Sequence, residues 1–360
     1  MPTLRRYVAR QFGANMVLML LAFASLLQLF DLLASSDDII KLHGARVSAF
    51  AWHALLNSPE IVTVVMPICA LLASLLTLAR LAHNNEVLAL KASGLSYYRL
   101  LLAFVPAAVA VGILHFAISD QITPRTSRAL VQWDNDSPKA KADIKIKDGF
   151  WIRDGDVLVR VGRVSRHGNQ LTSLTLFDRD KKGQILQRLS ADWAEHRDGT
   201  WQLHDVERLS LAVGEVATAT SVAVMTWRTS LTPRQFSDFA SPPSTLSLGE
   251  LWRFLSYPGT GSHPSYFYLT WFNKRLAIAI ASFMMVLLAA PVAQGMQRHG
   301  GIGRGMAIGV ALGFLYFVTD GFVLTLGEAG ALPPVLAAWS PSLLFATIGA
   351  TALVRMEGGI

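Results

Sequence analysis

Residues 14–33 read ANMVLMLLAFASLLQLFDLL, an apolar run that carries one charged residue, Asp31. A helix needs about 20 such residues to cross the roughly 30 Å hydrocarbon core of a bilayer. Arg5, Arg6 and Arg10 precede the run, as in a secretory signal peptide. The run is nevertheless longer than the usual signal-peptide apolar region of about 7 to 15 residues. It therefore predicts an uncleaved membrane-spanning helix.

Apolar runs of similar size recur along the chain and predict about six spans. They cover residues 12–34, 59–82, 99–119, 271–294, 305–326 and 336–354. Of the 360 residues, 52% are hydrophobic and 16% are charged, a balance that a soluble protein of this length hardly keeps in solution. The single cysteine, Cys69, lies inside the second run. This excludes a disulfide framework and predicts a packing role for Cys69.

The basic residues of the short loops gather on one side of the predicted spans. They are Arg5, Arg6, Arg10, Arg80, Lys91, Arg99, Arg298, Arg304 and Arg355. Because cytoplasmic loops carry an excess of Lys and Arg, both termini are expected in the cytoplasm, and the segments 35–57 and 327–334 outside. The net charge of +7 then reflects the membrane surface. No basic stripe interleaved with aromatic residues indicates a nucleic-acid partner.

Between residues 122 and 265 the composition becomes polar and alternates with a period of two, which is typical of half-buried strands. Val157, Val159 and Val161 show this alternation. Bulk for a core is expected from Trp151, Trp193, Trp201 and Trp227. The predicted fold is an α-helical membrane protein with an inserted all-β periplasmic domain, an open sandwich or jelly roll. Its expected parts are 1–122, 123–265 and 266–360.

No catalytic or metal motif accompanies this domain. Its histidines, His167, His196 and His204, are scattered, and neither H-E-x-x-H nor G-x-S-x-G occurs. We therefore expect no catalytic site, no metal site and no cofactor. An open sheet does offer exposed edge strands, which can pair with a strand of another protein.

After the second span, residues 80–94 read RLAHNNEVLALKASG and predict a short cytoplasmic helix over about 84–94. Asn84 or Asn85 can cap it, Glu86 lies in its first turn, and Gly94 can end it. One interpretation is a helix at the lipid surface. The other is a plug for a groove on a cytoplasmic partner.

Three stretches carry a family resemblance. They are NEVLALKASG at 85–94, GFWIRDGDVLVRV at 149–161 and WRTSLTP at 227–233. Together with the order of the spans they resemble the lipopolysaccharide export permease family (LptF/LptG), more closely its LptG branch than its LptF branch. The resemblance covers nearly the whole chain.

This resemblance implies the permease subunit of an ABC transporter in the inner membrane of a Gram-negative bacterium. The implied substrate is lipopolysaccharide. The implied partners are a sister permease (LptF-like), a homodimeric cytoplasmic ATPase (LptB-like), a single-span periplasmic partner (LptC-like) and a periplasmic bridge (LptA-like). The ATPase must be a separate chain, because GGIGRG at 300–305 lacks the Lys and Ser/Thr of a phosphate loop.

The resemblance also implies roles for individual residues. Contact with the ATPase falls to the short helix, through Glu86, Val87, Leu90 and Lys91. Arg304, at the start of the fifth span, either senses the same contact or is a positive-inside anchor.

Lipopolysaccharide carries phosphates, so basic groups near the outer surface are candidates to bind it. They are Lys41, Arg46, Arg125, Arg128, Lys274 and Arg275, and each could equally be a snorkelling anchor. Family members often carry a lysine near the outer end of the first span, where this chain has Gln28 and Asp31. For Asp31 and Asp320 we expect interhelical hydrogen bonds or a contact to the sister permease.

Small residues at Gly305, Gly309 and Gly313 predict that the fifth span packs closely against another helix.

Three other functions compete with the permease. A scaffold would dock periplasmic proteins without transport. A membrane-anchored enzyme would need a nucleophile and base, for which Ser93 and Lys91 are the only tempting pair. A proton-driven carrier would depend on Asp320, but no internal inverted repeat supports it.

Overall fold

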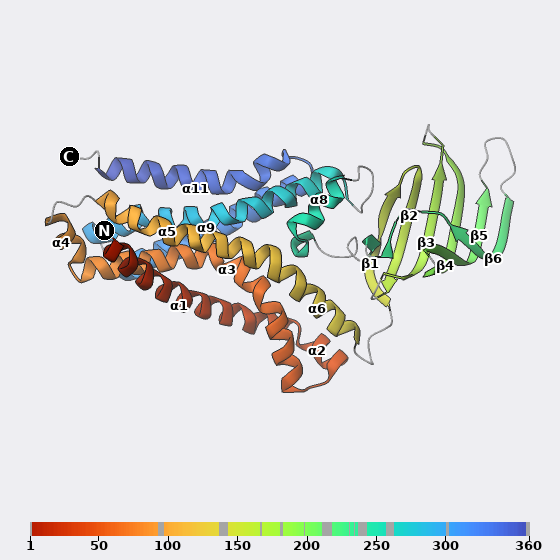
Figure 1. Cartoon of the computed structure of the whole chain (residues 1–360), viewed down its shortest axis with the longest axis horizontal. Coiled ribbons are helices and arrows are strands. Elements are labelled where there is room, and N and C mark those ends of the chain that lie inside the picture. The colour runs from red at the N-terminus through yellow and green to blue at the C-terminus, as the bar shows by residue number, and fades with distance from the viewer. Residues whose placement is uncertain are drawn as a thin grey trace. The chain divides into compact units, whose positions relative to one another are not determined.

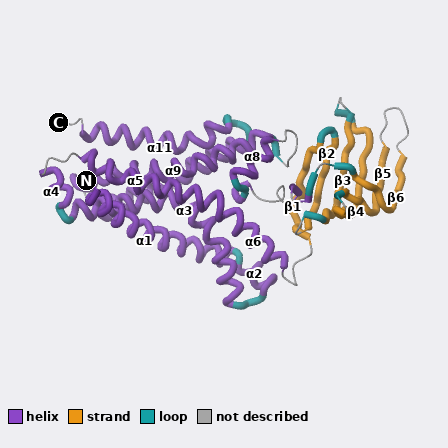
Figure 2. The backbone as a smooth tube through the Cα atoms, viewed as in Figure 1, coloured by secondary structure: helices purple, strands orange, loops and turns teal. Residues whose placement is uncertain are grey.

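The computed structural model describes residues 2–92, 97–136, 143–165, 168–180, 183–197, 199–210, 218–229, 231–233, 235–236, 243–256, 263–299 and 302–357. The chain divides into two compact units. The membrane unit comprises Met1–Asp37, Val47–Ser127 and Leu269–Ile360, and the sheet unit comprises Asp38–Arg46 and Arg128–Tyr268. Figure 2 shows that the strands occupy one continuous part of the chain and that long helices make up most of the rest.

Long helices build the membrane unit. They are α1 (Pro2–Ala34), α3 (Val47–His83), α5 (Tyr97–Ala117), α9 (Ser265–His299), α10 (Ile302–Glu328) and α11 (Pro334–Glu357), with the short α4 (Glu86–Ala92) after α3. A π-helical turn, Ile118–Ile122, joins α5 to α6 (Thr123–Asp136). Within the described residues, six helices are long and apolar enough to cross a membrane. The predicted six spans are therefore confirmed.

The helices extend beyond the apolar runs that predicted them. The segment 35–57, expected as an outer loop, contains α2 (Ser36–His43) and the first turns of α3. α3 continues through Pro59 and Pro67, which lack the N–H that would bond to the carbonyl four residues earlier. Side chains replace these bonds: Ser58 Oγ donates to the carbonyl of Leu55 (2.9 Å), and His115 Nε2 donates to that of Thr63 (3.0 Å).

The core of the membrane unit is centred on α3. Met66, Cys69 and Leu72 on this helix are almost fully buried, so the packing role predicted for Cys69 is confirmed. On α10, a Cβ at Gly309 would lie 2.3 Å from Leu75 Cδ1, and one at Gly313 would lie 2.4 Å from Ile68 Cγ1. These glycines let α10 approach α3 closely, which confirms the packing predicted from their spacing.

The sheet unit contains a six-stranded antiparallel sheet. Its strands are β1 (Asp143–Asp154), β2 (Val157–Ser165), β3 (Gln170–Arg179), β4 (Ile185–Arg197), β5 (Thr200–Ser210) and β6 (Thr218–Trp227). They lie side by side in chain order, as Figure 1 shows. The inserted β domain is confirmed. Residues 123–265 also contain the helices Thr123–Asp136 and Leu248–Ser256, so this part of the chain is not purely β. The described strands form one meander without the crossovers of a regular jelly roll.

One face of the sheet carries the core of this unit. Val159, Val161 and Trp201 are almost fully buried, and Trp201 Nε1 donates to the carbonyl of Leu231 at 2.9 Å. Trp227 is also buried, so the core roles predicted for these two tryptophans are confirmed. The buried set alternates with outward residues, as period-2 patterning requires.

The prediction of a core role was wrong for Trp151. Trp151 follows the period of two: its side chain points to the face opposite that of its buried neighbour Ile152 and is 41% exposed. On this outer face its ring stacks near Phe177, at 5.8 Å between centroids, with the Arg160 guanidinium 5.9 Å from its centre. Trp193 is half-buried and stacks on His204.

The sheet unit also contains α8 (Leu248–Ser256), most of α2 and the part of α6 that follows Ser127. His43 at the end of α2 stacks on Trp133 of α6, with ring centroids 3.6 Å apart, and its Nε2 lies 3.4 Å from Asp134. Ser247 caps α8: its backbone N–H and its hydroxyl both donate to Glu250 Oε2 (2.8 and 2.9 Å). In return, the backbone N–H of Glu250 donates to Ser247 Oγ (3.4 Å), which completes a capping box.

Candidate functional site

The short helix α4 forms immediately after α3. Asn85 adopts a positive φ of 57°, a conformation that asparagine tolerates better than most residues. Its carbonyl accepts the N–H of Ala89 (3.0 Å), the first hydrogen bond of α4. Asn85 therefore occupies the cap position, in agreement with one of the two predicted caps. Gly94, the predicted end, lies outside the described residues.

Glu86 lies at the junction of α1, α3 and α4. Tyr7 Oη on α1 donates to Glu86 Oε1 at 3.0 Å, and Asn84 Nδ2 donates to the same oxygen at 3.3 Å. The next residue, Val87, is 6% exposed and belongs to the core of the membrane unit. The side chains of Leu90 and Lys91 lie outside the described residues. Val87 thus fastens α4 to the bundle, while Glu86 is held at the bundle surface.

Two buried polar residues join α1 to α3 beside this junction. Arg80 Nη1 donates to Asn15 Oδ1 (2.7 Å), and Asn15 Nδ2 donates to Thr77 Oγ1 (2.8 Å). Asn15 and Thr77 are 1% and 0% exposed. Sequence reasoning placed Arg80 only as a positive-inside residue and missed this network. The available signal was the spacing of Tyr7, Gln11 and Asn15, which puts three polar side chains on one face of α1.

Three of the six basic lipid-binding candidates are exposed. Lys41 lies on α2, Arg46 precedes α3, and Arg125 lies on α6. Arg125 Nη2 donates to Gln121 Oε1 at 3.3 Å, one helical turn earlier. Arg304 was expected either to sense the ATPase contact or to anchor the fifth span. It is exposed in the first turn of α10.

The other three basic candidates contact partners within their own unit. Arg128 forms an ion pair with Glu250, and Lys274 forms one with Asp320. Arg275 is 3% exposed, and its guanidinium donates to the Ser119 carbonyl at 3.0 Å. Since Ser119 lies in the π-helical turn, Arg275 satisfies a carbonyl where the regular helical ladder is shifted. These contacts favour structural roles for the three residues.

Both carboxylates that the sequence placed in or near the spans, Asp31 and Asp320, contact another helix of this chain. Asp31 Oδ2 lies 3.3 Å from His53 Nε2 on α3, and Asp320 on α10 pairs with Lys274 on α9. Two further contacts between spans had no sequence signal. His115 Nδ1 lies 2.7 Å from Ser282 Oγ, and Trp271 Nε1 donates to Glu328 Oε1 at 2.7 Å.

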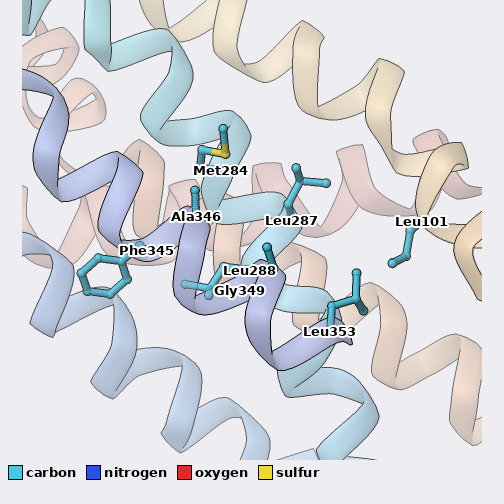
Figure 3. A pocket seen from close by; sticks show the side chains of 9 residues that line it. Leu101, Met284, Leu287, Leu288, Phe345, Ala346, Gly349 and Leu353 are labelled. Carbon is cyan, nitrogen blue, oxygen red and sulfur yellow. The ribbon is translucent and has the colours of Figure 1, made fainter. Parts of the chain in front are cut away.

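A small pocket lies between α5, α9 and α11 (Figure 3). It has a volume of about 150 Å³ and is lined by Leu101, Met284, Leu287, Leu288, Phe345, Ala346, Gly349, Ala350 and Leu353. Its lining offers hydrocarbon contacts and no group for acid–base or nucleophilic chemistry. Among the described residues, no group of three or more His, Cys, Asp or Glu could hold a metal ion.

Comparison with known proteins agrees with this architecture. The family model "Lipopolysaccharide export system permease LptF/LptG" matches residues 6–355. The lipopolysaccharide export system permease protein LptG of Haemophilus influenzae is 25% identical over 352 residues, which cover 95% of this chain and 96% of that protein. LptG of Escherichia coli K12 is 25% identical over 309 residues, 84% of each chain. The chain with six candidate spans and an inserted sheet therefore belongs to the LptF/LptG family of lipopolysaccharide export permeases.

Proposed function

We propose that this chain is the LptG-type permease subunit of an ABC transporter that extracts lipopolysaccharide from the inner membrane. The transporter passes the lipid to a periplasmic bridge for delivery to the outer membrane. The observation that carries the proposal is the family match over residues 6–355, which covers the inserted sheet and all of the candidate spans except Arg5. Both relatives named above are lipopolysaccharide export permeases.

In the proposed orientation both termini and α4 face the cytoplasm, and the sheet unit faces the periplasm. The distribution of Lys and Arg in the short loops supports this orientation. The proposed partners on the two sides follow from it. An LptB-like ATPase homodimer binds α4, and LptC-like and LptA-like proteins receive the lipid at the sheet.

The chain has no phosphate loop of its own, so a partner must hydrolyse ATP. The energy of this hydrolysis reaches the chain through α4. Two residues of α4 suit this role. Val87 fastens the helix to the core, and Glu86 presents a carboxylate at the surface of the bundle. Lys91 follows Glu86 by five positions on the same helix. Closure of the ATPase dimer moves α4 and, through it, the spans.

The lipid path is built with an LptF-like sister permease. Large apolar side chains on α1 and α10 remain uncovered by this chain, among them Leu21 and Phe322, both 66% exposed. A cavity between the two permeases would use such faces for acyl chains. Lys41, Arg46 and Arg125, the exposed basic candidates, would bind the lipid phosphates.

The first test is co-purification of the chain from its native membrane, followed by mass spectrometry of bound proteins and lipids. We expect a sister permease, a nucleotide-binding subunit and lipopolysaccharide. A chain that emerges alone with bulk phospholipid would contradict the transporter. A chain that brings only periplasmic proteins and does not stimulate an ATPase would instead support the scaffold.

A further inference from the structure

We propose that Tyr7 is a positioning residue that ties α4 to the first span, so that movement of α4 is transmitted to α1. The inference rests on the proposed role of α4 as the contact with the ATPase. It assigns a residue on another helix to that contact and explains how a displacement of α4 reaches a span that is not continuous with it.

The tie is one hydrogen bond between α1 and α4, and it joins two residues that are 79 positions apart in the sequence. Tyr7 Oη donates to Glu86 Oε1 at 3.0 Å at the bundle surface. Figure 1 shows the N-terminal end of α1 beside α4. An exposed hydrogen bond of this kind biases an equilibrium by about twofold to tenfold.

A second anchor on α1 does not involve α4. Asn15, bonded to Arg80 and Thr77 of α3, lies eight residues after Tyr7, about 12 Å along the helix. This anchor is buried, whereas the Tyr7 anchor is exposed. Between the two anchors, Val8 and Phe12 of α1 pack into the core of the membrane unit, 0% and 2% exposed. The Tyr7 hydrogen bond therefore joins α4 to an end of α1 that is already packed on the bundle. A shift of α4 would therefore act, through Tyr7, on the start of α1 together with the core residues packed beside it.

Glu86 can hold Tyr7 and a partner at the same time. Within the described residues both of its hydrogen bonds fall on Oε1, and a carboxylate offers about four lone-pair positions on its two oxygens. The carboxylate therefore has lone pairs left that can accept a hydrogen bond from a basic side chain of the ATPase. Glutamine at this position would keep a carbonyl oxygen for Tyr7 and lose the negative charge that attracts such a base.

This separation makes the inference testable with the complete transporter in lipid nanodiscs. The variants are Tyr7→Phe, Glu86→Gln, Glu86→Ala and the double variant Tyr7→Phe/Glu86→Ala. A matched control is Tyr316→Phe, which removes the hydroxyl that lies 3.4 Å from Ser342 in the bundle. Two quantities are measured for each: backbone hydrogen exchange of residues 86–92, and lipopolysaccharide released per ATP hydrolysed.

We expect Tyr7→Phe to raise exchange in 86–92 by about threefold to tenfold and to lower release per ATP. Glu86→Gln should lower release while leaving exchange in the nucleotide-free complex near wild type. Tyr7→Phe should add nothing in the Glu86→Ala background, because the tie is already absent. The Tyr316 control should change neither quantity.

Two results would overturn the inference while leaving the proposed function intact. One is wild-type exchange and release for Tyr7→Phe, with Glu86→Ala impaired. The other is an equal effect of Tyr7→Phe with or without Glu86, which would show that Tyr7 acts through another residue. Normal release by both Tyr7→Phe and Glu86→Ala would overturn the proposed coupling role together with the inference.

Discussion

The helix α3 and the helices α1 and α10 are all apolar enough to span a membrane, yet they differ in how much of them this chain covers. In the apolar stretch of each helix, 72% of α3 is buried by the rest of the chain, compared with 6% of α1 and 17% of α10. α3 is therefore an internal scaffold. α1 and α10 present apolar faces that only lipid or another protein can cover.

The scaffold is also where polar groups meet across helices. Thr77 contacts Asn15 of α1, His53 contacts Asp31 of α1, and the carbonyl of Thr63 accepts from His115 of α5. Polar groups at membrane depth must be satisfied within the protein. The comparison teaches that hydropathy identifies the spans, whereas the burial of each span within the chain decides which of them is the internal scaffold.

The largest effect is expected from leaving a charge unpaired between spans. Lys274→Ala leaves the Asp320 carboxylate, 19% exposed, without its partner and should lower the free energy of unfolding by about 3 kcal/mol. Thermal unfolding in nanodiscs measures the loss. The double variant Lys274→Met/Asp320→Leu should recover most of it, and Lys41→Ala, at an exposed site, serves as the control. Wild-type stability for Lys274→Ala would show that the pair lies outside the fixed part.

A smaller effect is expected where α10 approaches the scaffold. Gly313→Ala places a Cβ within 2.6 Å of two atoms of Ile68, and the required shift should cost about 1–3 kcal/mol of stability. Gly321→Ala on the same helix meets nothing within 4 Å, so it should be neutral or slightly stabilising. Equal stabilities of the two variants in thermal unfolding would contradict the close packing of α10 on α3.

The smallest effect on stability is expected on the uncovered face. Phe322→Ala, at a side chain that is 66% exposed, should change the unfolding free energy of the isolated chain by less than about 0.5 kcal/mol. If the sister permease covers this face, the same variant should recover less of that partner in co-purification. A large loss of stability in the isolated chain would break the distinction between scaffold and uncovered face.

Local pattern was enough to predict the spans, the strands and the position of α4. Alternation such as Val157 to Val161 and capping by Asn85 depend on neighbours in sequence, so they are readable without tertiary structure. The same alternation, applied to Trp151 and Ile152, would have placed Trp151 on the outer face. The size of the Trp151 side chain favours a core position, but the register of the strand decides which face it occupies.

The polar contacts were not predictable in this way. His115 and Ser282 are 167 positions apart, and Arg275 and Ser119 are 156 apart. In the sequence Lys274, Arg275 and Arg125 all appear as basic residues near span ends. In the three-dimensional structure, Lys274 and Arg275 have interior partners whereas Arg125 is exposed. The sequence does not show this difference, because the choice of partner depends on how the helices pack.

The most direct test of the account is ATP-driven release of lipopolysaccharide by the transporter that contains Glu86→Ala. The complex, reconstituted in proteoliposomes with the ATPase and a periplasmic acceptor, is assayed for ATP hydrolysis and for lipid transferred. We predict that the variant assembles and hydrolyses ATP but releases at least about tenfold less lipid per ATP, as expected for a lost charged contact. Wild-type release per ATP would contradict the claim that energy enters this chain through α4.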